Sequence, residues 1–285
     1  MPGLNILAVL AHPDDEGVCG GTLAKNVRLG GRSTLICATR GEVGEISDPA
    51  LATPETLGEV RERELREACA LLGIDPPIFL DYRDSGMEGT EPNSDPRAFI
   101  NADRTEIVRR LVREIRRLRP DLVITFEQFG IYGHPDHRLV SSLATDAFAE
   151  AGSPELYPEA GEPWQPAKLL YATFVREWFQ RWIEATRQQG EEPPPRREMG
   201  TPEAEVTTFV DIRDVLDIKR RAMLAHRTQI SPSGAWGKEW TEEQKQLFGI
   251  EAFVRAAPAA CSRRTRRAVR SSRVASVIAC CHATG

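Results

Sequence analysis

The chain has 285 residues, of which 37 are basic and 42 acidic, so its formal net charge is −5. A chain of this length can form one α/β domain or two small ones and can bury a substantial core. The acidic balance argues against a nucleic-acid partner bound through a basic face, and no stretch approaches the roughly 20 apolar residues that a membrane span requires.

Two further features of the composition concern the cellular compartment. The apolar run near the N-terminus has no basic segment before it, so no signal peptide is predicted. Three of the six cysteines lie in expected helices and strands and three in the C-terminal segment, and none has the CxxC spacing of a metal or redox site. We therefore expect a cytoplasmic protein whose body carries reduced thiols.

Strands and helices alternate along the first half of the chain. The apolar run at residues 5–11 predicts a buried strand, and helical spacing follows over residues 17–29. Two later helices are expected to follow N-caps at Thr53 and Asp103. Further strands are expected at residues 33–39, 77–82 and 122–126, and the next helix at 135–151. This alternation predicts an α/β fold with a doubly wound, mostly parallel, Rossmann-like sheet.

The pattern changes in the second half of the chain. A strand is expected at residues 167–175, an amphipathic helix at 177–188 and a short strand at 205–210. Asp211 is the expected N-cap of a further helix, and the polar, proline-rich residues 190–202 read as a surface loop. These later elements predict a C-terminal lid or subdomain on the sheet.

We expect one domain over residues 1–255, in which residues 1–152 form the core sheet and metal site and residues 153–255 form the lid or subdomain. Residues 256–285 contain six arginines and no acidic residue, which predicts a basic, disordered tail. A helix docked on the acidic body, and an arm for nucleic acid or membrane, are the alternatives for this segment.

Acidic residues and a histidine follow the first expected strand. The segment His12-Pro13-Asp14-Asp15-Glu16 lies in the turn between this strand and the next helix. In open α/β sheets, ligands bind in the crevice at the carboxyl ends of the strands. Buried carboxylates and an imidazole are costly to leave unpaired, and a cation would satisfy them. The nitrogen of His12 and an oxygen of Asp15 suit zinc.

A second histidine-rich segment follows the expected strand at residues 122–126. It reads Tyr132-Gly133-His134-Pro135-Asp136-His137 and should open into the same crevice. This loop offers the third protein ligand that a catalytic zinc site usually has, beside an open position for water.

These two segments resemble the paired signatures of the LmbE-like, PIG-L-type zinc de-N-acetylases. Supporting matches are Gly41-Glu42-Val43-Gly44-Glu45, Arg61 with Glu64-Leu65, and Arg83-Asp84-Ser85-Gly86-Met87. The resemblance covers roughly residues 4–255. It implies a hydrolase that removes an acetyl group from an N-acetylglucosaminyl-type substrate by means of a zinc-activated water.

The resemblance also implies roles for eight residues. The expected metal ligands are His12, Asp15 and His137, and Asp14 is the expected general base. His134 would polarise the carbonyl or protonate the leaving amine, and Tyr132 would help to bind the oxyanion. Arg61 and Asp84 match family positions that hold the sugar. Zn²⁺ is the expected metal, although Fe²⁺ or another divalent ion fits the same ligands.

Three further residues are expected to have structural roles. Asp136 would orient a ligand histidine, and Glu16 would stabilise the start of a helix. His226 falls on the apolar side of its helix, so a buried core histidine is favoured over a site role.

Alternative functions remain open at the level of sequence. Gly161-Glu162-Pro163-Trp164 and the segment His226 to Ile230 resemble an amidase branch that acts on larger glucosaminyl amides such as thiol S-conjugates. An iron(II) oxygenase uses a similar ligand set, but usually on a β-barrel. A sugar-binding protein without catalysis would not need Asp14. In each case the expected partner is a small molecule, and a homo-oligomer is compatible with the sequence.

Overall fold

The structure is a computed structural model that describes residues 3–188, 199–234 and 236–256. Its centre is a seven-stranded sheet of strand order β3-β2-β1-β4-β5-β7-β6. The strands are β1 (Asn5–Leu10), β2 (Arg32–Thr39), β3 (Ile78–Tyr82), β4 (Leu122–Phe126), β5 (Lys168–Thr173), β6 (Thr208–Asp211) and β7 (Ile250–Arg255). Strands β1 to β5 are parallel, whereas β7 runs antiparallel to both β5 and β6.

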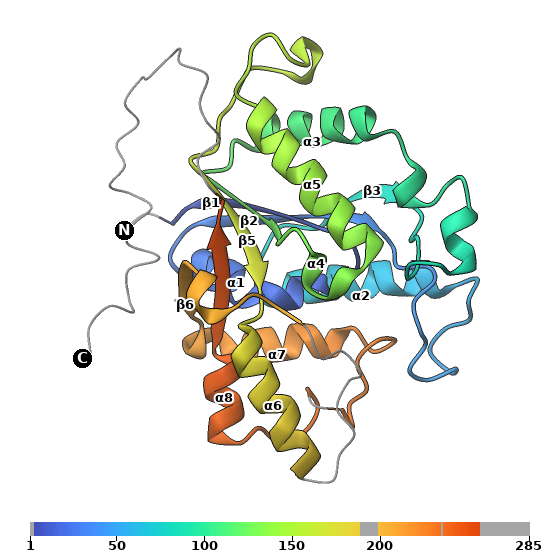
Figure 1. Cartoon of the computed structure of the whole chain (residues 1–285), viewed down its shortest axis with the longest axis vertical. Helices are drawn as coiled ribbons and strands as arrows, with labels where there is room; N and C mark the ends of the chain where they lie inside the picture. The colour runs from blue at the N-terminus through green and yellow to red at the C-terminus, as the bar shows by residue number, and fades with distance from the viewer. Residues whose placement is uncertain (1–2, 189–198, 235, 257–285) are drawn as a thin grey trace.

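Helices cover both faces of the sheet, as Figure 1 shows. Helices α3 and α5 pack together on one face, and α1, α2 and α7 pack on the other. Helices α6 and α8 lie beyond the carboxyl end of β5 (Figure 1). The helix bounds are α1 (Gly20–Arg28), α2 (Leu57–Leu72), α3 (Arg104–Leu118), α4 (Gly130–Gly133), α5 (Pro135–Glu150), α6 (Arg176–Gln188), α7 (Leu216–Ala225) and α8 (Glu242–Phe248). This is the expected doubly wound, mostly parallel α/β fold.

Some expected boundaries were wrong for local reasons. Helix α2 begins at Leu57 because the preceding residues form a turn, in which the amide of Thr56 donates to the carbonyl of Thr53. Asp211 belongs to β6, and its carboxylate accepts the amide hydrogen of Arg213 rather than capping α7. The expected tail lies outside the described residues, as does most of the expected loop at 190–202.

The C-terminal half of the chain also contributes strands to the sheet. Strands β5, β6 and β7 extend it beyond β4, and neither β7 nor α8 was anticipated from the sequence. The carboxylate of Glu251 on β7 accepts the amide hydrogens of Gly21 and Thr22, at 2.9 and 2.7 Å, and so satisfies the start of α1. Helix α1 has no side-chain cap of its own, so a residue 230 positions away supplies one. None of the described helices is long and apolar enough to cross a membrane.

Arg116 on α3 forms hydrogen bonds with the segment that connects α5 to β5. Its guanidinium is 3% exposed and donates to five backbone carbonyls at 2.5–3.2 Å. The acceptors are the carbonyls of Ala151, Ser153, Leu156, Tyr157 and Gly161.

Arg116→Met is therefore expected to lower the free energy of unfolding by about 3 kcal/mol, since buried carbonyls would lose their donors. Chemical denaturation measures this change. Arg117→Met is the matched control, because Arg117 is exposed on the same helix and pairs with Glu114 at the surface; that variant should stay within about 0.5 kcal/mol of the parent. Equal effects of the two substitutions would contradict the assigned role.

Candidate active site

The site lies where the direction of strand order reverses. From β1 the chain first adds β2 and β3 on one side and then returns to add β4 on the other, so the crevice between β1 and β4 is the switch point at which α/β folds bind ligands. His12 follows β1, and His137 lies in the first turn of α5, which follows β4. The two loops meet there, as expected.

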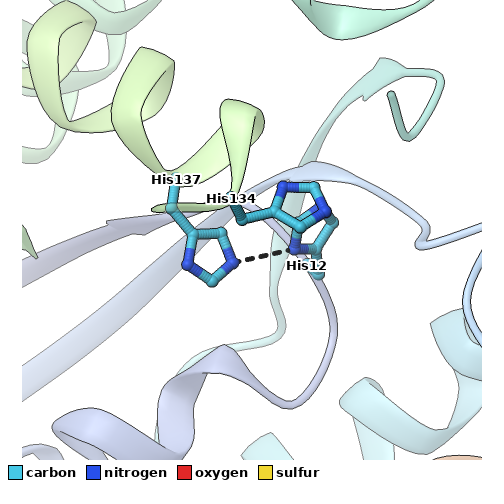
Figure 2. Close-up of side chains that lie close together, drawn as sticks. All are labelled: His12, His134 and His137. Carbon is cyan, nitrogen blue, oxygen red and sulfur yellow. Dashed lines mark hydrogen bonds between the residues drawn. The ribbon is translucent and has the colours of Figure 1, made fainter. Parts of the chain in front are cut away.

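The side chains of His12, Asp15 and His137 face one another at this point. The Nδ1 atom of His12 lies 3.1 Å from Nε2 of His137, which in turn lies 3.2 Å from Oδ1 of Asp15. Oδ2 of Asp15 is 3.4 Å from Nδ1 of His12. Figure 2 shows the two histidine rings turned toward each other, with His134 beside them. The three expected metal ligands thus lie side by side, and a different oxygen of Asp15 lies near each histidine.

The other nitrogen of each histidine has a fixed partner. Nδ1 of His137 lies 3.2 Å from the carbonyl oxygen of Gly130, which can only accept a hydrogen bond. Nε2 of His12 lies 3.1 Å from a carboxylate oxygen of Asp136. In the neutral form of both rings, these partners place the protons on Nε2 of His12 and Nδ1 of His137, so that unprotonated nitrogens face the same point. Two lone pairs that face each other beside the Asp15 carboxylate would be stabilised by a cation between them.

The contact between the two histidine nitrogens suits zinc. A tetrahedral zinc ion with bonds of about 2.0–2.1 Å separates its ligand atoms by about 3.3–3.4 Å. Nδ1 of His12 and Nε2 of His137 are 3.1 Å apart, and each lies 3.2–3.4 Å from a different oxygen of Asp15. Two groups of buried side chains in the described chain each bring together one potential ligand atom per residue, and neither includes Asp15: His12, His134 and His137, and His12, Asp84 and Asp136. In the second group, the carboxylates lie on the Nε2 side of His12, where Asp136 is hydrogen-bonded.

The electrostatics of His12 and Asp15 reflect this crowding. Burial alone would lower the pKa of His12, but Asp84, Asp136 and Asp15 hold that pKa well above its usual value. Burial would raise the pKa of Asp15, but His137 and His12 hold it well below its usual range. The carboxylates therefore stabilise positive charge at this point.

Asp14 stands beside the three atoms in an unusual conformation. Its φ of 94° lies in the left-handed region, which an asparagine or aspartate tolerates better than most residues. Its amide donates to Glu16 at 3.1 Å, and its side chain, 27% exposed, borders the site cavity. Burial raises the pKa of the Asp14 carboxyl to about 6, and Asp15 adds to this while Arg61 opposes it.

His134 is the N-cap of α5 and has one ring nitrogen committed to that task. Its Nδ1 accepts the amide hydrogen of Asp136 at 3.2 Å, so the proton of the neutral ring is on Nε2. Burial lowers the pKa of His134 to about 4, helped by His12 and His137. The ring of Tyr132 packs edge-on against both His134 and His137. A neutral N–H donor and a phenol thus lie next to the expected metal ligands.

Arg61 and Asp84 are both close to the site, but both are largely enclosed. The guanidinium of Arg61 donates to the carbonyls of Gly41 and Pro13, at 2.9 and 2.6 Å, and to the carboxylate of Asp14 at 3.3 Å. Asp84 is 3% exposed; it accepts the amide hydrogen of Gly86 and lies 3.5 Å from His12. Their contacts in the structure are with the loops around the site, and their expected contact with the sugar stays a prediction.

Comparison with known proteins agrees with this geometry. Residues 7–148 match the PIG-L family, described as GlcNAc-PI de-N-acetylase. The chain is 39% identical over 267 residues to the 1D-myo-inositol 2-acetamido-2-deoxy-alpha-D-glucopyranoside deacetylase of Rhodococcus erythropolis, with 88% of this chain and 90% of the relative covered. The deacetylase of the same name from Nocardiopsis dassonvillei is 41% identical over 263 residues, with 87% and 92% covered. The chain belongs to the PIG-L family of de-N-acetylases.

A solved structure extends the comparison to the fold. The N,N'-diacetylchitobiose deacetylase from Pyrococcus horikoshii superposes with a TM-score of 0.62 at 22% identity, covering 89% of this chain and 84% of that one. The expected PIG-L resemblance is thereby confirmed. PIG-L proteins are hydrolases that act on amide carbon–nitrogen bonds, and the relatives named above are deacetylases, so the amidase alternative is not favoured.

Two buried ion pairs around this PIG-L site were not anticipated. His226, just past the end of α7, pairs through Nε2 with Glu16, and both side chains are at most 1% exposed. Lys219 on α7 pairs with Glu251 at 2.8 Å. The partners of each pair are far apart in the sequence, so no local sequence pattern predicts the pairing. His226 is a buried histidine, as the sequence favoured, and its partner Glu16 also receives the amide of Asp14.

A cavity of about 400 Å³ opens from the site toward α6 and α8. Asp14, Asp15 and His137 are among the residues that line it, and most of the other lining residues are aromatic or aliphatic. The wall residues from the second half of the chain include Phe174, Trp178, Phe179, Trp182, Trp236 and Phe248. The sequence predicted an amphipathic helix at residues 177–188, now α6, but did not indicate that it lines a cavity.

Proposed function

We propose that the protein is a zinc-dependent deacetylase that removes the acetyl group from the amide nitrogen of an N-acetylglucosaminyl-type small molecule. The observation that carries this proposal is the convergence of His12, Asp15 and His137 within 3.1–3.4 Å of one another, in a chain of the PIG-L family. The substrate class is that of the named relatives, which deacetylate a glucosaminide of inositol.

His12 Nδ1, His137 Nε2 and an oxygen of Asp15 are the proposed ligands. Support comes from their mutual distances and from the hydrogen bonds that fix each ring, since a metal-bound histidine almost always donates its other N–H to a carbonyl or carboxylate. Gly130 is required here, because a Cβ on it would lie 2.6 Å from the Cβ of His137. His134 is the less suitable ligand, since the amide of Asp136 already uses its Nδ1.

A bound zinc ion would supply a more acidic water and would polarise the amide carbonyl. Asp14 is proposed to accept the proton of the attacking water, because its carboxylate adjoins the ligands and reaches the cavity. His134 would donate a hydrogen bond from Nε2 to the carbonyl oxygen as negative charge develops there, and Tyr132 would add a second donor. The proton taken up by Asp14 would then pass to the leaving amine.

The proposal is tested by measuring acetate release from a panel of N-acetylglucosaminyl compounds, with and without a chelator. Release that stops with the chelator and returns when Zn²⁺ is added supports the assignment. Release that continues unchanged after all metal has been removed would refute it. The three described cysteines, Cys19, Cys37 and Cys69, are buried free thiols, which supports the further proposal of a cytoplasmic location.

Arg61→Lys is expected to lower kcat/KM by about 10- to 100-fold at unchanged zinc content, because one ammonium cannot serve the three oxygens that the guanidinium bridges. The way in which the loss divides between kcat and KM is informative. A fall in kcat indicates that Arg61 holds Asp14, whereas a rise in KM indicates the predicted sugar contact.

The matched control for Arg61 is Arg63→Lys, which changes an exposed arginine on the same helix. Asp84→Asn tests the other predicted sugar contact in the same assay. Unchanged kinetics in Arg61→Lys or in Asp84→Asn would remove that residue from the site.

A further inference from the structure

The cavity beside the metal-ligand residues is much larger than an acetyl group. It measures about 400 Å³, whereas a methyl group is similar in size to a water molecule, whose share of liquid volume is about 30 Å³. A methyl would therefore leave most of the cavity empty or filled with water. An aromatic cavity of this size is typical of a site for an apolar ligand group.

The polar side chains of the cavity wall are already engaged. Lys219 and Glu251 pair with each other, and Glu251 also accepts three hydrogen bonds from Gly21 and Thr22. The hydroxyl of Thr173 is hydrogen-bonded to that of Thr201 at 2.8 Å. Beyond Tyr132 and the residues of the metal site, the wall in the described part of the chain thus offers few groups to a sugar or an inositol ring.

The aromatic side chains that line the cavity pack against other aromatic rings. Trp178 stacks on Phe209, with ring centroids 5.6 Å apart, and Phe179 packs against Trp182 at 5.5 Å. Trp236 packs against Phe248 on α8, with ring centroids 5.5 Å apart, and both residues line the cavity. Packing of this kind keeps the cavity open before a ligand arrives and so reduces the cost of binding.

Polar and apolar groups lie on different sides of the metal-ligand atoms. Asp14, Asp15 and His137 border the cavity, whereas Arg61, Asp84 and His134 do not. In an amide the acyl chain and the nitrogen substituent leave the carbonyl carbon in different directions. With the sugar on the side of the polar loops, the acyl chain of the same amide extends into the aromatic cavity.

We propose that this cavity binds the acyl chain of the substrate and that the enzyme hydrolyses N-acylglucosamines with linear chains longer than acetyl, up to about eight carbons. The inference rests on the proposed function and specifies the acyl group. The reaction is amide hydrolysis: water adds its hydroxyl to the acyl carbon, the carbon–nitrogen bond breaks, and a proton passes to the nitrogen, giving a linear carboxylic acid and free glucosamine.

The test compares N-acetyl-, N-butanoyl-, N-hexanoyl- and N-octanoylglucosamine as substrates of the zinc-loaded full-length enzyme. Each buried methylene should raise kcat/KM by about three- to fourfold until the cavity is filled. A flat or falling series overturns the inference, while acetate release from the acetyl compound leaves the proposed function standing. A parallel measurement with octyl N-acetylglucosaminide tests the other occupant: preference for this compound alone would assign the cavity to the aglycone and overturn the acyl assignment.

A binding measurement keeps the test independent of turnover. Octanoate should bind the protein at least about tenfold more tightly than acetate by calorimetry, and it should perturb the fluorescence of the cavity tryptophans. Equal affinity for the two acids would overturn the inference even if every substrate were inert.

Variants of α6 complete the experiment. Trp178→Ala should reduce the ratio of kcat/KM for octanoyl over acetyl by about tenfold. Arg181→Ala, an exposed change on the same helix outside the cavity wall, should leave that ratio unchanged. A ratio that is the same in both variants would count against an acyl chain beside Trp178, and the octanoate measurement applies to both proteins.

Discussion

Asp14→Asn is expected to lower kcat by about 10²- to 10⁴-fold, the usual contribution of a general base, while zinc content and melting temperature stay near those of the parent. The substitution removes the basic oxygen but preserves shape. Asparagine also tolerates the left-handed conformation that this position has, with φ of 94°. The loss should therefore reflect chemistry and not a rearranged loop.

The measurement combines steady-state kinetics with elemental analysis of the same preparation. Asp15→Asn is the companion variant, since it alters the neighbouring carboxylate that faces both ligand histidines at 3.2 and 3.4 Å. It should lose metal, whereas Asp14→Asn should not. If Asp14→Asn loses zinc and regains activity when zinc is added, the two aspartates have each other's roles.

His137→Ala is expected to weaken zinc binding by more than about 100-fold, because removal of a direct ligand should exceed the 10- to 100-fold cost of losing a hydrogen-bonded partner of a ligand. Activity at ordinary zinc concentrations should fall below detection. Metal content by elemental analysis, after dialysis against a weak chelator, measures the effect. Stoichiometric metal in this variant would refute the ligand assignment.

His134→Asn is the matched control for His137→Ala. Asparagine is among the best N-cap residues, so it can replace the ring nitrogen that accepts the amide of Asp136 at the start of α5. The variant should keep its zinc and lose activity. Loss of zinc from His134→Asn would instead favour the alternative group formed by His12, His134 and His137.

Much of this site could be predicted because its parts are local in sequence. A buried strand followed at once by polar residues places those residues at a sheet edge, and β1 and β4 are neighbours in the sheet, so their loops converge. The carbonyl of Gly130 and the carboxylate of Asp136 follow the same logic, as they lie in the loop and helix that carry His137.

What the sequence could not reveal depends on distant partners. The Glu16–His226 pair joins residues 210 positions apart, and a single buried charge carries no local signature of its partner. Arg61 shows the same limit: its match to a family position indicated a site role, but only the fold shows that its guanidinium donates hydrogen bonds to the carbonyls of Pro13 and Gly41. The aromatic cavity likewise arises from α6, α7, α8 and β7 together.

The cap that Glu251 provides for α1 has a consequence for how the protein is made. The first helix to leave the ribosome begins with amide groups whose partner lies on β7, the last described strand. Until β7 has been synthesised and has paired with β5, these amides can bond only to water, and Lys219 lacks its counter-ion. In a nascent chain that ends before Glu251, the loops that carry His12 and His137 are therefore present before the sheet that supports them is complete. Folding of the hydrolase should therefore be completed by the contact of Glu251 with the start of α1, which joins residues that are very far apart in the sequence. Formation of such a contact is slow compared with local helix formation.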